Sequence, residues 1–214
     1  NLEPLYLIQG ISLTDYTNNN SEDAYDDKYI KSIRERSKIT VDVIHGKKII
    51  VLNRGYGFGN YRKDVSEWLM GYIIGEEWNS YTIAYTNNEQ ESGFKGEYFE
   101  TMEEANAFET LLARQMDEII KYETEKYNHQ SLISFSNSLD TDPFEYDEYY
   151  AGQVSKFVSL DLENIKATDN LKSGYFASYS LSGREDKYYE YFSQEEKDKL
   201  QSKIINNEGI KDNY

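Results

Sequence analysis

The chain has 214 residues, a length that fits one large domain and can bury a core without disulfides or metals. It contains no cysteine, which excludes disulfides, cysteine nucleophiles, iron-sulfur clusters and thiolate zinc sites. Its formal net charge of −16 at pH 7 repels nucleic-acid phosphates and anionic lipid headgroups and favours encounter with basic partners. We therefore predict a single acidic domain over residues 1–214 that binds neither nucleic acid nor lipid headgroups directly and needs no cofactor.

The first half of the chain predicts an antiparallel β meander. Two β-branched runs, 39–43 and 49–52, flank His45-Gly46-Lys47-Lys48, which is typical of a hairpin. A strand or short helix is expected over 68–74. Further strands are expected over 78–85 and 94–99. No stretch reaches the roughly 18 consecutive apolar residues that a membrane-spanning helix needs.

The clearest predicted helix runs from Thr101 to about Tyr127, behind a capping box of Thr101 and Glu104. Its apolar residues recur every three or four positions and should pack on the sheet; they are Ala105, Phe108, Leu112, Ile119 and Tyr122. Later strands are expected over 132–135, 154–162 and 175–181, and a last helix over 193–205. The predicted fold is α+β: an antiparallel β meander packed against one long α-helix, with a short C-terminal helix.

Motifs for catalysis are absent or incomplete in the sequence. His45 and His129 have no partner at metal-ligand spacing, and we expect both on the surface. The glycine turn 55–59 lacks the third glycine of a dinucleotide fingerprint and the Gly-Lys-Ser/Thr of a P-loop, so an irregular turn is expected. No serine stands in a G-x-S-x-G frame. The sequence therefore favours a protein that is not an enzyme.

The most unusual stretch, 139–150, holds five acids, four aromatic residues and no base. Asp140 and Asp142 begin like a calcium loop, but the required glycine and the closing Glu are missing. A solvated loop and a recognition surface remain, and the aromatic residues favour recognition, with tyrosine rings as contact area and carboxylates that meet Lys or Arg. The predicted partner-binding residues are Asp140, Asp142, Glu145, Tyr146, Asp147, Glu148, Tyr149 and Tyr150.

The Asn/Lys/Tyr/Glu-rich composition and the acidic, tyrosine-rich stretch 143–150 resemble small immunity proteins of Gram-positive bacteria, above all the TipC-type immunity proteins. Members of that family are anchored outside the membrane and bind an exported type VII secretion toxin. The resemblance lies in size and general character, and it transfers no individual residue. It implies an immunity protein, or toxin inhibitor, that neutralises a basic or cation-bearing protein toxin by direct contact.

The chain begins with Asn1 rather than Met, so we expect that a signal or membrane anchor has been removed. The expected location is extracytoplasmic, at the cell surface or secreted. The alternative function is an exported surface or lipoprotein-like domain that binds a small ligand or Ca²⁺.

Overall fold

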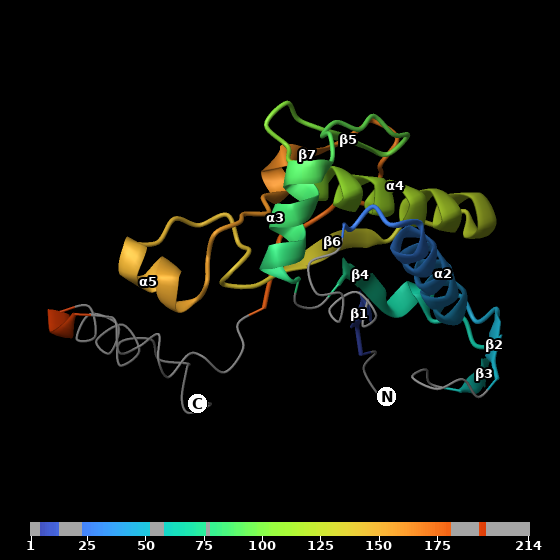
Figure 1. Cartoon of the computed structure of the whole chain (residues 1–214). Helices are drawn as coiled ribbons and strands as arrows, with labels where there is room; N and C mark the ends of the chain where they lie inside the picture. Colours follow the sequence, from blue (N-terminus) through green and yellow to red (C-terminus); the bar gives the residue numbers. More distant parts are fainter. Residues whose placement is uncertain (1–4, 13–22, 52–57, 76–77, 181–192, 196–214) are drawn as a thin grey trace. The chain divides into compact units, whose positions relative to one another are not determined.

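A computed structural model of the chain describes residues 5–12, 23–51, 58–75, 78–180 and 193–195. The chain divides into two units, Asn1–Ser180 and Leu181–Tyr214. In chain order the elements of the first unit (Figure 1) are β1 (Leu7–Ile11), α2 (Asp27–Ile44), β2 (Lys48–Ile50), β3 (Gly59–Tyr61), η1 (Ser66–Trp68), β4 (Leu69–Ile74), α3 (Ser80–Glu89), β5 (Phe99–Thr101), α4 (Ala107–Tyr127), β6 (Leu132–Asn137), α5 (Glu148–Gln153), η2 (Leu162–Asn164), β7 (Ile165–Ala167) and β8 (Ser178–Tyr179).

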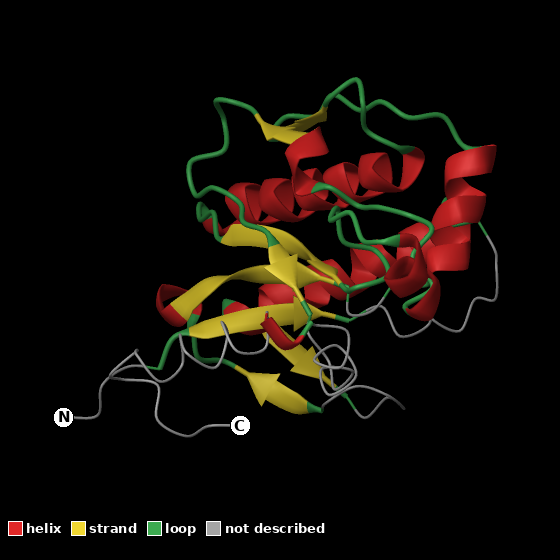
Figure 2. Cartoon of the chain, turned by 90° about the vertical axis from the view of Figure 1, so that its left-hand side faces the viewer, coloured by secondary structure: helices red, strands yellow, loops and turns green. Residues whose placement is uncertain are grey.

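The main sheet has four strands in the order β1-β4-β6-β8, and every neighbouring pair is parallel (Figure 2). Parallel neighbours need long crossovers: α2 lies in the crossover between β1 and β4, and α3 and α4 lie between β4 and β6. Antiparallel pairing is confined to β2-β3 and β5-β7 among the described strands. The fold is therefore α/β, and the predicted antiparallel meander on one long helix is wrong.

One face of the sheet forms the core with α4. Tyr72 of β4 and Ile133 of β6 are register partners and share that face, and the Tyr72 hydroxyl donates a hydrogen bond to Glu123 of α4. Ile74 and Phe135 follow two residues later on the same face and are buried. Figure 1 shows α4 running along the sheet, with α2 and α3 beside it. The longest helix thus lies along a parallel sheet with two further helices beside it, and not as the one helix on an antiparallel meander.

Helix α4 begins later than predicted. Asn106 is its N-cap and accepts a hydrogen bond from the Glu109 backbone N–H, while Glu109 Oε2 accepts one from the Asn106 backbone N–H at 2.9 Å. Thr101 ends strand β5 instead. The predicted buried positions Phe108 and Leu112 are confirmed, with 0% and 1% of their surface exposed.

Two predicted strands are helices. Residues 39–44 belong to α2, whose residues Ile33, Val41 and Ile44 lie on one buried face. Burial of that face outweighs the weak preference of β-branched residues for strands. Similarly, the predicted strand 78–85 is mostly α3, because Asn79 caps that helix by accepting hydrogen bonds from the N–H groups of residues 81 and 82.

The remaining predictions have mixed outcomes. The predicted strand 132–135 is confirmed within β6, and 68–74 contains strand β4. The segment 154–162, which the structure describes throughout, holds no strand, and 175–181 contains only the two-residue β8 among its described residues. The glycine turn 55–59 and the C-terminal helix 193–205 lie largely outside the described residues.

None of the described helices combines the length and apolarity that crossing a bilayer requires.

Candidate functional site

The acidic stretch follows the carboxyl end of strand β6. In open α/β sheets, ligands bind in the crevice outside the carboxyl ends of the parallel strands. β6 ends at Asn137 and the stretch begins two residues later, while β4 leads at the same end into the N-terminus of α3. The parallel sheet therefore places the predicted recognition residues at the edge where functional loops gather.

Asp140 ties the stretch to α3. Its Oδ2 accepts a 2.6 Å hydrogen bond from Ser80 Oγ in the first turn of α3, and its Oδ1 accepts one of the same length from Ser138 Oγ. On the other side, Asn137 Nδ2 donates to the Leu160 carbonyl at 2.8 Å. The start of the loop is thus fixed to two segments that are distant in sequence.

Asp142 forms the buried base of the loop. Only 3% of its surface is exposed, and its Oδ1 pairs with Lys156 Nζ at 3.0 Å. Oδ1 also accepts the Phe144 backbone N–H at 3.0 Å, and Oδ2 accepts the Tyr146 hydroxyl at 2.6 Å. Lys156 Nζ further donates to the Asp142 carbonyl. These contacts give Asp142 and Tyr146 a structural role beside the partner contact predicted for them.

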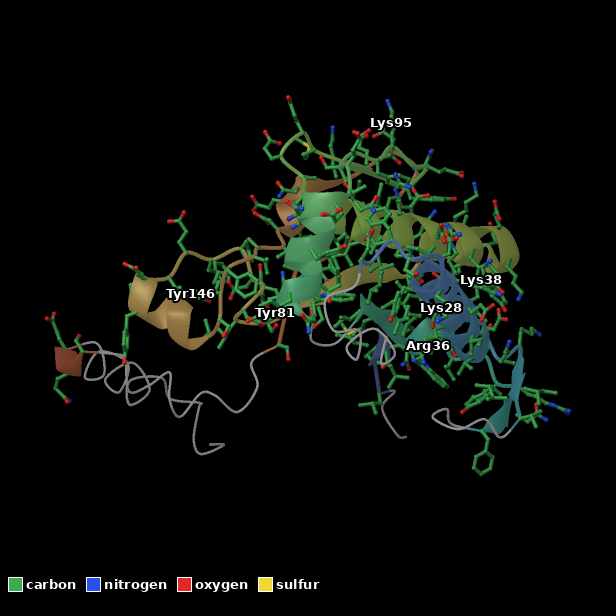
Figure 3. The ribbon with its side chains drawn as sticks, in the orientation of Figure 1. Lys28, Arg36, Lys38, Tyr81, Lys95 and Tyr146 are labelled. Atoms are coloured by element: carbon green, nitrogen blue, oxygen red, sulfur yellow. The ribbon has the colours of Figure 1, made fainter. Side chains whose placement is uncertain are left out.

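The residues beyond this base are open to solvent. Phe144 is 52% exposed and Tyr149 is 66% exposed, and Glu145, Asp147 and Glu148 are exposed as well. Glu148 starts helix α5, which also contains the backbone of Tyr150. In Figure 3, Tyr146 lies beside α5. We call the five exposed residues 144, 145, 147, 148 and 149 the acidic-aromatic edge.

The structure adds aromatic residues that sequence reasoning missed. Tyr81 of α3, 65% exposed and labelled in Figure 3, packs on Phe157 with ring centroids 5.0 Å apart. Phe144 packs on Tyr179 of β8 with centroids 5.3 Å apart. The sequence pattern predicts strands at Tyr81 and Phe157, and both predictions are wrong. The one local signal for Tyr81 is the Asn-Ser pair at 79–80, which is typical of a helix N-terminus.

A buried polar cluster around Glu123 lies at the opposite, amino end of the strands. Glu123 is fully buried and accepts hydrogen bonds from the Tyr72 hydroxyl at 3.0 Å and from Ser131, through its backbone N–H at 2.8 Å and its Oγ at 3.0 Å. His45 Nε2 lies 3.0 Å from the same carboxylate. The cluster joins α2, β4, α4 and the start of β6.

The prediction of His45 as a surface residue is wrong. Its side chain is 3% exposed, its Nδ1 lies 3.7 Å from Asp64, and Tyr127 stacks on its ring with centroids 3.9 Å apart. His129, which is half-buried, meets the His45 ring edge-on at 5.6 Å. His45 thus closes the Glu123 cluster on the side of α2, and we assign the cluster a structural role.

The described residues contain no group of three or more His, Asp or Glu side chains that could hold a metal ion. In addition, the carboxylate oxygens of Asp142 are already engaged by Lys156, Tyr146 and the loop backbone. The incomplete calcium loop therefore folds as a lysine-paired turn.

Comparison of the chain with protein-family models, with curated proteins and with solved structures finds no match. Function is consequently inferred from the arrangement of residues at the carboxyl edge of the sheet.

Proposed function

We propose that this chain is a non-enzymatic protein-binding module that recognises a basic partner through the acidic-aromatic edge. The observation that carries the proposal is the contrast between the buried Asp142, paired with the partly buried Lys156, and the exposed residues just beyond them. A fixed base holds Phe144 and Tyr149 outward, so less side-chain and loop freedom is lost on binding. Exposed aromatic rings on a fixed frame are typical of recognition surfaces.

The charge around this edge favours a basic partner. Residues 76–150 contain 18 acidic and 4 basic residues, a balance of −14. At the edge itself Glu145, Asp147 and Glu148 add their charges to the exposed rings. Such a field accelerates association with a positively charged surface and disfavours acidic competitors.

Within this class, toxin immunity is the form of the proposal that the resemblance to TipC-type immunity proteins supports. A chain of this kind would act outside the cytoplasm and neutralise an exported toxin by covering its surface. The alternative, a domain that binds Ca²⁺ or a small ligand, has less support because Asp142 is paired with Lys156.

Neutralising the edge should slow association with the partner. The full chain, immobilised at low salt, would capture a partner from the secreted proteins of its source organism, and the purified partner would then be used for kinetics. We expect the double variant Asp147→Asn/Glu148→Gln to associate several-fold more slowly and with a flatter salt dependence, because exposed charges act through steering over ~10 Å at 0.1 M salt. Its dissociation rate should change little.

The matched control is Glu103→Gln/Glu104→Gln, which removes the same charge at two exposed positions ahead of α4. If the two double variants associate at the same rate, the effect is one of net charge alone and the edge is not the interface.

A further inference from the structure

A pocket of about 450 Å³ lies directly beside the acidic-aromatic edge. Three segments form it: residues 143–144 of the loop, residues 161–163 at the start of η2, and residues 175–179, which include β8. Its volume falls within the ~300–1,000 Å³ of typical ligand sites. The pocket is therefore large enough to receive a side chain from a bound protein.

Aromatic rings line the pocket and are held by their own packing. Tyr175 meets the fully buried Phe99 edge-on, with centroids 5.7 Å apart and an interplanar angle of 86°. Phe144 and Tyr179 support each other at 5.3 Å. Phe176 also lines the pocket. The faces of aromatic rings carry negative charge density and attract cations.

Two carboxylates complete the lining. Asp161 is fixed because its backbone N–H donates to the buried Glu109 at 2.6 Å and its Oδ1 accepts the Glu163 backbone N–H at 2.9 Å. Glu163 is exposed. Among the described residues, no Lys or Arg forms an ion pair with either carboxylate. The pocket thus presents negative charge that the described part of the chain leaves unpaired.

The ionisation of Tyr179 agrees with this negative environment. Burial raises the pKa of its hydroxyl, and the charges of Asp161, Asp142 and Glu163 raise the pKa further. A cation placed in the pocket would be stabilised by the same carboxylates.

We propose that the pocket receives an arginine side chain of the protein partner, with the guanidinium against the aromatic rings and paired with Asp161 and Glu163. A guanidinium is planar, stays charged, stacks on aromatic faces and can donate two parallel hydrogen bonds to one carboxylate. It therefore matches this lining better than an ammonium does. The neighbouring loop contains a cation with the same two kinds of contact, a carboxylate and an aromatic ring. Lys156 Nζ pairs with Asp142 and lies 5.5 Å from the centre of the Tyr146 ring. The inference rests on the proposed function and names the group that the partner contributes.

The test uses the ¹⁵N-labelled full chain and a blocked pentapeptide with one central arginine among four glycines. The same peptide with citrulline, which keeps the shape and lacks the charge, is the control ligand. We expect weak, saturable binding of the arginine peptide, with shifts centred on the amides of Ala177 and Tyr179, and no saturation with citrulline. Glu163→Gln should weaken binding roughly three- to fivefold, and Tyr179→Leu by a similar factor.

Glu103→Gln is the matched charge control and should bind the peptide like the unmodified chain. Equal binding of the citrulline peptide, or equal effects of Glu163→Gln and Glu103→Gln, would overturn the proposal. Peptide binding does not need the partner protein, so the two claims fail separately. If the chain captures a partner but does not bind the arginine peptide, only the arginine site is contradicted. If the chain binds the peptide but captures no partner, the proposed function is contradicted.

Discussion

Replacing Glu123 with alanine is expected to lower the free energy of unfolding by about 3–5 kcal/mol. The carboxylate is fully buried and satisfies the Tyr72 hydroxyl, His45 Nε2 and two donors of Ser131. Its removal leaves these polar groups buried without an acceptor, and each such group costs about 1–3 kcal/mol. Urea denaturation at pH 7 measures the change through the midpoint at constant slope.

Glu125→Ala is the matched control for this variant. Glu125 lies on the same helix but is exposed, and its carboxylate is 3.8 Å from Lys121. Exposed pairs of this kind contribute about 0.2–1 kcal/mol at most. A loss below about 1 kcal/mol for Glu123→Ala would mean that the Glu123 cluster does not hold the four elements together.

Replacing Phe108 with alanine is also expected to lower the free energy of unfolding by about 3–5 kcal/mol, because the ring is fully buried on the inner face of α4 and a cavity would remain. Phe108 packs edge-on against Trp78, with centroids 5.3 Å apart, so the loss also affects the connection from β4 to α3. Tyr85→Ala removes an aromatic side chain that is 44% exposed and should cost far less. Similar midpoints for the two variants would contradict the assignment of the buried face of α4.

Periodicity in the sequence identified the elements whose local pattern and tertiary environment favour the same secondary structure. The apolar recurrence from Phe108 to Ile119 predicted α4, and the apolar run at 132–135 predicted β6. It failed for the second half of α2 and for α3, where short β-branched runs are typical of strands but burial against α4 favours helix. Both segments lie in crossovers between parallel strands, so assigning them to strands led to the wrong prediction of an antiparallel sheet.

Composition located the acidic stretch but gave no information on the contacts that hold it in place. Lys156, Ser80 and Glu109 hold the loop and the adjacent turn, and they act across 14 to 60 residues of sequence. Contacts between residues so far apart leave no pattern in the local sequence. For the same reason the burial of His45 was not predicted. A histidine before a glycine is typical of a turn, and Glu123, which contacts His45 in the structure, lies 78 residues later in the sequence.

The central claim, that the acidic-aromatic edge is the interface, is tested most directly by one paired measurement on Tyr149→Ala and Tyr146→Ala. Both variants remove a tyrosine of the same stretch. Tyr149 is 66% exposed, whereas the Tyr146 hydroxyl bonds the buried Asp142. The dissociation rate from the captured partner and the thermal midpoint would be measured for each.

We predict that Tyr149→Ala dissociates roughly 30-fold faster, which corresponds to a loss of about 2 kcal/mol, with a smaller change in the thermal midpoint than Tyr146→Ala shows. Tyr146→Ala should lower the midpoint, because it removes one of the hydrogen bonds that fix the base of the loop. An unchanged dissociation rate for Tyr149→Ala, measured well below the thermal midpoint of the variant, would contradict the assignment of the acidic-aromatic edge as the interface.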